Sequence, residues 1–174
     1  MIHTYIEHTP KRTSAAALDW PGWARSGRDE AGALQALLDY APRYARILQA
    51  AEIDFAPPND LSDFVVVERK PGNATTEFGA PDVPAEADER PVDNVELGRL
   101  LALFEAYWQA FDATVELARG KELRKGPRGG GREIDGIVEH VAGGDHSYLS
   151  LLVWKWNKPK GLSPSEMLGP TRQA

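Results

Sequence analysis

The chain has 174 residues, is 42% hydrophobic and 26% charged, and carries a formal net charge of −6. This composition is typical of a globular protein, and the length suits one domain or two small ones. The net negative charge argues against a nucleic-acid-binding protein, because such proteins carry broad basic faces. The absence of cysteine excludes disulfides, thiolate nucleophiles and thiolate metal sites.

The N-terminus and the hydropathy pattern predict a cytoplasmic protein. Residues 1–12 alternate polar and apolar side chains and lack the apolar core of a signal peptide. No run approaches the ~18 apolar residues of a membrane span. We therefore expect no membrane contact.

The first 70 residues predict a β-β-β-α-β unit. Four segments have strand-like alternation or β-branched runs: residues 2–8, 12–18, 23–26 and 63–69. A turn through Pro21 and Gly22 joins the second strand to the third, because proline fixes φ and glycine permits positive φ.

A helix is predicted between the third and fourth strands. Asp29 is a favourable N-cap. The apolar stripe that follows contains Leu34, Leu37, Leu38 and Ala41. Pro42 is expected to end this helix and to start a second one, since proline breaks a helix interior but suits a first turn.

The stretch AAALDWPGWARSGRDEAGALQALLDYA, residues 15–41, resembles the HicB-like antitoxins. In that family a strand, a Pro-Gly turn, a strand ending in glycine and an acidic helix start occur at this spacing. The resemblance implies a partial RNase H-like fold over residues 1–70. It also implies a protein partner, because HicB-like antitoxins sequester a small toxin. The predicted strands carry no cluster of acidic residues, so the sequence does not predict nuclease chemistry.

Residues 71–93 are predicted to be an irregular connection. They contain prolines at positions 71, 81, 84 and 91, glycines at 72 and 79, and an acidic run at 86–89. Phe78 is the expected apolar anchor of this segment. A stretch of this length is a solvated linker, a domain boundary or a functional flap.

The second half of the chain predicts helices. Apolar residues spaced by four and three indicate a helix from residue 92 to 119, ended by Gly120, with the packing seam Leu97, Leu101, Phe104, Trp108, Phe111 and Val115. A second helix is expected over residues 132–156, with the buried face Ile134, Ile137, Val138, Val141, Tyr148 and Leu152. The short connection favours antiparallel packing within a helical part at 94–156.

Residues 157–174 predict a tail with one short helical turn, since Ser163, Pro164 and Glu166 suit a capping box. The predicted fold class is therefore α+β. An N-terminal β-β-β-α-β unit packs with C-terminal antiparallel helices.

The stretch IDGIVEHVAGGDHSYLSLL, residues 134–152, resembles a helix of the DinB-like proteins. These are four-helix bundles that include thiol-dependent transferases and isomerases. The resemblance covers residues 95–154 and implies that His140 is a ligand of a divalent metal. The family's other two histidine ligands have no counterpart here. The two-part layout also resembles uncharacterised proteins of actinobacterial type.

A glycine-rich loop has the best local chemistry for a ligand. Residues 121–132 carry five basic side chains and one acidic one, a net of +4. Glycine backbone N–H groups and the start of a helix favour an anion. The expected ligand-binding residues are Arg124, Lys125, Arg128, Gly129, Gly130, Gly131 and Arg132. The alternatives are a solvated connection and a contact with a protein or nucleic acid.

A second candidate site centres on His140. It lies on a helix flank among three glycines that leave room for a ligand, Gly136, Gly143 and Gly144. Glu105 and Asp112 on the facing helix would complete a metal site, with His140 and Glu105 as catalytic residues. The alternatives are a partly buried histidine and solvated helix surface. Asp145 falls on the apolar stripe and should be paired if it is buried.

The lead functional hypothesis is a small-molecule binding protein for a phosphate, sulfate or carboxylate. A metal-assisted transferase or isomerase of DinB-like type is a further form of this hypothesis, with a divalent metal as its cofactor. The alternative is a HicB-like antitoxin or a regulatory interaction module that uses the edge of the N-terminal sheet.

Overall fold

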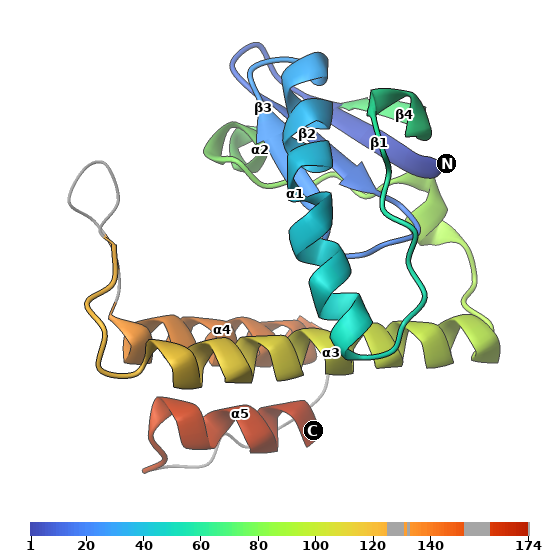
Figure 1. Ribbon diagram of the computed structural model, residues 1–174. Helices are drawn as coiled ribbons and strands as arrows, with labels where there is room; N and C mark the ends of the chain where they lie inside the picture. Colours follow the sequence, from blue (N-terminus) through green and yellow to red (C-terminus); the bar gives the residue numbers. More distant parts are fainter. Residues whose placement is uncertain (125–130, 132, 152–160, 174) are drawn as a thin grey trace. The chain divides into compact units, whose positions relative to one another are not determined.

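The computed structural model describes residues 1–124, 131, 133–151 and 161–173 (Figure 1). Its fold is mixed α+β, as predicted. The chain divides into two compact units, Met1–Trp108 and Gln109–Ala174, and each is considered by itself. None of the helices in the described part of the chain combines the length and apolar character needed to cross a bilayer.

The first unit has the predicted β-β-β-α-β order. Its elements are β1 (Ile2–His8), β2 (Thr13–Ala17), β3 (Ala24–Gly27), α1 (Glu30–Ala50) and β4 (Phe64–Pro71), with the 3-10 helix η1 (Leu61–Asp63) before β4. The strands form one sheet in the order β3-β2-β1-β4. All neighbours are antiparallel except β1 and β4, which run parallel.

The pairing of β1 with β4 contains a register shift. Thr4 pairs with Val66 and Tyr5 pairs with Glu68, so Val67 has no partner across the ladder. Such a β-bulge turns the following side chains relative to those before it. Glu68 consequently lies on the same side of the sheet as Tyr5.

Helix α1 runs through Pro42 without a break, so the predicted second helix is wrong. Asp29 is the N-cap as expected, and its carboxylate accepts a hydrogen bond of 2.8 Å from Gly32 N. Pro42 is exposed, whereas Leu37, Tyr44 and Leu48 are buried on either side of it. The continuous buried face offsets the hydrogen bond that proline cannot donate.

One face of the sheet packs against α1 and forms the core of this unit (Figure 1). Trp23 is its largest fully buried side chain, stacked on Tyr44 with ring centroids 5.3 Å apart. The indole Nε1 donates to the carbonyl of Leu37 at 3.1 Å, which satisfies its only polar group. Ile6 and Leu103 complete the same cluster.

The other face of the sheet is polar and is covered by residues 72–93, here called the strap. The segment expected to be irregular contains α2 (Ala74–Phe78) and the 3-10 helix η2 (Glu86–Glu89). Phe78 is exposed, so its predicted role as an apolar anchor is wrong.

The anchor of the strap is Glu7 of β1. Its side chain is fully buried and accepts hydrogen bonds of 2.9 Å from the backbone N–H groups of Asp82 and Val83. The hydroxyl of Thr76 donates to the other carboxylate oxygen. Three donors therefore satisfy a buried charge that would otherwise destabilise the fold.

Helix α3 (Asn94–Ala118) presents a different face from the predicted one in the first unit. Leu97, Leu101 and Phe104 are 48%, 59% and 53% exposed. Leu103 and Ala106 are buried instead. The predicted packing seam is thus wrong for this half of α3. This half carries two apolar faces, and the face with Leu103 and Ala106 packs on the core.

The second unit contains the C-terminal part of α3, α4 (Ile134–Leu151) and α5 (Pro164–Gln173). Helix α4 runs back along this part of α3, as predicted (Figure 1). The buried cluster is formed by Val115, Val138, Ala142, Met167 and Leu168.

Two details of the second unit differ from expectation. Tyr148 is exposed, although the sequence predicts it on the buried face of α4. Helix α5 has 10 residues rather than a single turn. Its predicted cap is present, since Ser163 N donates to the Glu166 carboxylate at 2.8 Å. The expected end of α4 at residue 156 lies outside the described residues.

Candidate functional site

The predicted anion-binding loop lies mostly outside the described residues. Arg124 and Gly131 are described, and both are exposed. The remaining members fall outside the described ranges: Lys125, Arg128, Gly129, Gly130 and Arg132. Anion binding by this loop therefore stays a prediction.

The predicted metal residues belong to both units, since Glu105 lies in the first and His140 and Asp112 lie in the second. His140 and Glu105 are exposed, and the Asp112 carboxylate accepts hydrogen bonds of 2.7 and 3.0 Å from the guanidinium of Arg172. Within the described ranges, no three or more His, Cys, Asp or Glu side chains are grouped so that they could hold a metal ion. Added Cβ atoms at Gly143 and Gly144 would meet nothing within 4 Å, so no other backbone among the described residues approaches them.

Asp145 on α4 is partly buried, and one of its carboxylate oxygens has no hydrogen-bond partner in the described part of the chain. Burial raises the pKa of Asp145, and the charge of Arg172 opposes that shift. The expected pairing is present only as this electrostatic interaction.

A recess of the described residues lies in the first unit, beside the part of the strap that leaves the polar face of the sheet. It consists of two adjoining clefts of about 610 and 640 Å³, here called the sheet cleft and the helix cleft. Together they are called the groove. Both clefts are lined by Leu18, Asp19, Ala87 and Arg90. These volumes are within the range of small-molecule sites.

The sheet cleft is completed by side chains from two strands and η2: His3, Val67, Glu68 and Glu86. The alternation of β1 directs His3 to the polar face, and the bulge at Val67 brings Glu68 to it. The backbone N–H of Glu86 donates to Glu68 at 3.0 Å and so fixes η2 against the sheet.

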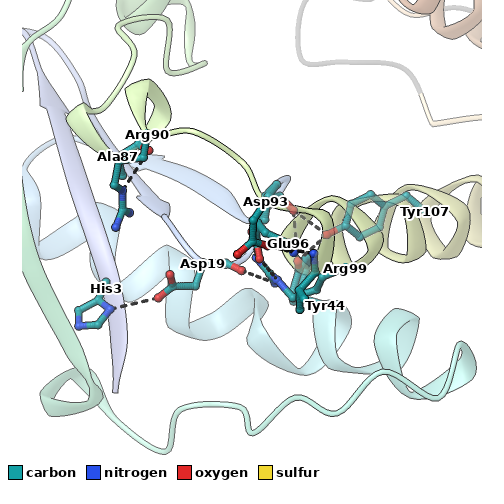
Figure 2. Close-up of polar contacts among 11 residues, drawn as sticks. His3, Asp19, Tyr44, Ala87, Arg90, Asp93, Glu96, Arg99 and Tyr107 are labelled. Carbon is teal, nitrogen blue, oxygen red and sulfur yellow. Dashed lines mark hydrogen bonds and ion pairs between the residues drawn. The ribbon is translucent and has the colours of Figure 1, made fainter.

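His3 and Asp19 form a carboxylate–imidazole pair in this cleft (Figure 2). The imidazole Nδ1 lies 3.1 Å from a carboxylate oxygen of Asp19, and each side chain is about half exposed. A carboxylate oxygen accepts, so Nδ1 is the donor of this hydrogen bond and Nε2 is the ring nitrogen left for another contact.

The two arginines of the groove differ in their engagement (Figure 2). Arg99 donates two hydrogen bonds of 2.9 and 2.7 Å to Glu96 and a third, of 2.8 Å, to the carbonyl of Asp19. Hydrogen bonding to Arg99 lowers the pKa of Glu96. Arg90 uses only Nε, which donates to the carbonyl of Ala87 at 3.3 Å. Its terminal nitrogens have no protein partner among the described residues.

The sequence contains one signal for this site that the predictions did not use. Arg90 is the only basic residue between Lys70 and Arg99, and it follows an acidic run. A lone cation kept in such a segment is a candidate for a specific contact. The pairing of His3 with Asp19 has no comparable signal, because it depends on the register of β1 and β2.

The chain matches no family model, and neither a curated protein nor a solved structure is similar to it. The HicB-like and DinB-like resemblances therefore stay predictions. The groove is the part of the described structure from which a function can be proposed.

Proposed function

We propose that the protein binds a small anionic ligand in the groove of its first unit. The observation that carries this proposal is the guanidinium of Arg90, whose terminal nitrogens are unengaged in the described structure where the two clefts adjoin. Guanidinium binds carboxylate or phosphate through two parallel hydrogen bonds. A cytoplasmic location is part of the same proposal.

The neighbouring charges favour a monoanion, and therefore a carboxylate. Glu68 forms an ion pair of 2.9 Å with Lys70, whereas the Asp19 carboxylate is hydrogen-bonded to His3 and forms no ion pair with a lysine or arginine among the described residues. Glu86 has no side-chain contact of this kind among the described residues, and its carboxylate would repel a doubly charged phosphate more strongly than a carboxylate.

Binding is proposed rather than nucleophilic catalysis. The described lining of the groove contains no serine, threonine or cysteine. Nε2 of His3 can accept a hydrogen bond from a hydroxyl group of the ligand, and Asp19 holds the ring in place for this contact. No described cluster supports the metal-assisted transferase or isomerase hypothesis.

The test is binding of simple carboxylates at constant ionic strength, measured by calorimetry and by thermal shift. We expect carboxylates to stabilise the parent protein, and Arg90→Ala to weaken binding about 10- to 100-fold, the range for a charge-assisted hydrogen bond. Arg46→Ala is the matched control: it removes the same charge from an exposed position of α1 that lines neither cleft. Absence of binding, or equal losses in the two variants, would contradict the proposal.

A second comparison distinguishes carboxylate binding in the groove from carboxylate binding at the glycine-rich loop. The double variant Arg128→Ala/Arg132→Ala should leave carboxylate binding unchanged if the groove is the site. Loss of binding in this variant, together with normal binding by Arg90→Ala, would assign the ligand to the loop and overturn the groove proposal.

The alternative hypothesis, an antitoxin-like partner module, would use an edge of the sheet. Strand β4 lies at one edge, and its bulge at Val67 interrupts the regular ladder that an added strand would extend. Bulges protect sheet edges against such pairing. The groove is therefore the better-supported site.

A further inference from the structure

We infer that the ligand is amphiphilic, with its carboxylate head at Arg90 and an uncharged apolar body along the helix cleft. This inference rests on the proposed function, because Arg90 sets the position of the head. It adds the chemical class of the ligand, which anion binding alone does not specify.

The helix cleft has a mixed lining, in which apolar side chains lie next to Arg90. These apolar members come from the turn after β2, from the strap and from α3: Leu18, Pro21, Ala87, Pro91, Val92 and Leu100. Val92 is 55% exposed. A ligand body that covers this surface removes it from water, which is the main favourable term for an apolar group.

Apart from Arg90, the charged side chains of the helix cleft have hydrogen-bond partners, which for Asp19 is His3. Arg99 and Glu96 neutralise each other through two hydrogen bonds. Asp88 accepts a hydrogen bond of 2.8 Å from the backbone N–H of Ala85. A second negative charge on the ligand would therefore find no free cation in this cleft, which together with the apolar side chains favours an uncharged body.

One wall of the helix cleft is held rigid from behind. The carbonyl of Pro21 accepts hydrogen bonds from the hydroxyls of Tyr44, at 3.1 Å, and Tyr107, at 2.6 Å. The two hydroxyls are also 2.6 Å from each other. Proline fixes the backbone φ at this position. A wall fixed in this way lowers the ordering cost of binding.

The experiment is calorimetry with a series of straight-chain carboxylates from butanoate to octanoate. Each methylene that enters the helix cleft should tighten binding about fourfold, from ~0.8 kcal/mol per buried CH₂. Arg90→Ala should weaken binding of all members by one common factor, because it removes only the head contact.

Two variants on the apolar side sharpen the test. Val92→Ser should weaken octanoate binding about fivefold, since part of a valine surface is lost, and leave butanoate unchanged. Val95→Ser is the matched control, because Val95 is 83% exposed and does not line the cleft. It should change neither affinity.

The outcomes distinguish the two proposals. Equal affinities across the series, with loss in Arg90→Ala, would overturn the amphiphilic ligand and leave anion binding standing. Octanoate binding that survives Arg90→Ala would place the chain on another apolar surface and overturn the inference. Absence of binding by every member would contradict the proposed function itself.

Discussion

The two faces of the sheet in the first unit are held by different forces. On the α1 side, Ile2, Ile6 and Ala15 are buried among aromatic and aliphatic side chains. On the strap side, the alternate residues of β1 are His3, Tyr5 and Glu7, of which His3 and Glu7 are hydrogen-bonded to polar groups. Apolar packing has little directionality, whereas each hydrogen bond on the strap side fixes a particular backbone position.

This difference explains where the groove lies. The apolar face packs against α1, with Leu103 of α3 in the same buried cluster. The polar face is covered by the strap, which Glu7 and Glu68 hold through hydrogen bonds, and Glu68 also lines the sheet cleft. Stability and recognition are thus divided between the two faces of the same strands.

The largest expected effect comes from breaking the apolar face. Leu37→Ala removes a fully buried side chain in the middle of α1 and should lower the free energy of unfolding by about 3–4 kcal/mol. Urea denaturation measures this change. Leu34→Ala is the control: Leu34 is only partly buried, so its loss should be clearly smaller. Equal losses would contradict the assigned core.

Breaking the polar face should have an intermediate effect. Glu7→Gln keeps the side-chain shape but weakens the contacts to the strap, at a cost of about 1–2 kcal/mol. The strap should loosen, so a glutamate-specific protease should cleave after Glu89 faster than in the parent. Glu105→Gln, at an exposed position of α3, should change neither quantity. An unchanged cleavage rate in Glu7→Gln would show that Glu7 does not anchor the strap.

The smallest expected effect is a pH-dependent change in stability that arises from Tyr5 on the polar face. Burial, followed by the charge of Glu7 and other carboxylates, raises the pKa of Tyr5 to about 12. Because the folded state holds this proton more tightly, the contribution of Tyr5 to stability is full below pH 10 and is lost as pH rises toward 12. At pH 11 the loss is on the order of 1 kcal/mol.

Tyr5→Phe should therefore change stability little at pH 7 and should unfold at a higher temperature than the parent at pH 11. The measurement is the difference in Tm between the two proteins from pH 8 to pH 11. Tyr44 and Tyr107 also have raised pKa values, but they contribute equally to both proteins. Tyr148→Phe, at an exposed position of α4, should show no such difference.

Local patterns predict much of the first unit. The alternation of residues 2–8 identifies β1, and Asp29 marks the start of α1. The end of the helix predicted at Pro42 is wrong because the local rule considers only the lost hydrogen bond. The helix continues because Tyr44 and Leu48, beyond Pro42, are buried in the core. Tertiary packing decides the outcome at that position.

Features that depend on distant partners are not readable from the chain. Helix α3 has two apolar faces, and spacing alone does not say which one meets the core through Leu103. The strap is ordered by Glu7, a residue far away in the sequence. In the groove, the lone basic residue Arg90 could have been noticed, but its neighbour His3 comes from the opposite end of the unit.

The central place of β1 in the sheet imposes an order on folding during synthesis. Its pairing with β2 needs only a short turn and can form early. Its parallel pairing with β4 joins residue 2 to residue 64 and must wait until that stretch has been made. Until then one edge of β1 is open to other chains, so the nascent protein is most exposed to aggregation before residue 71 leaves the ribosome.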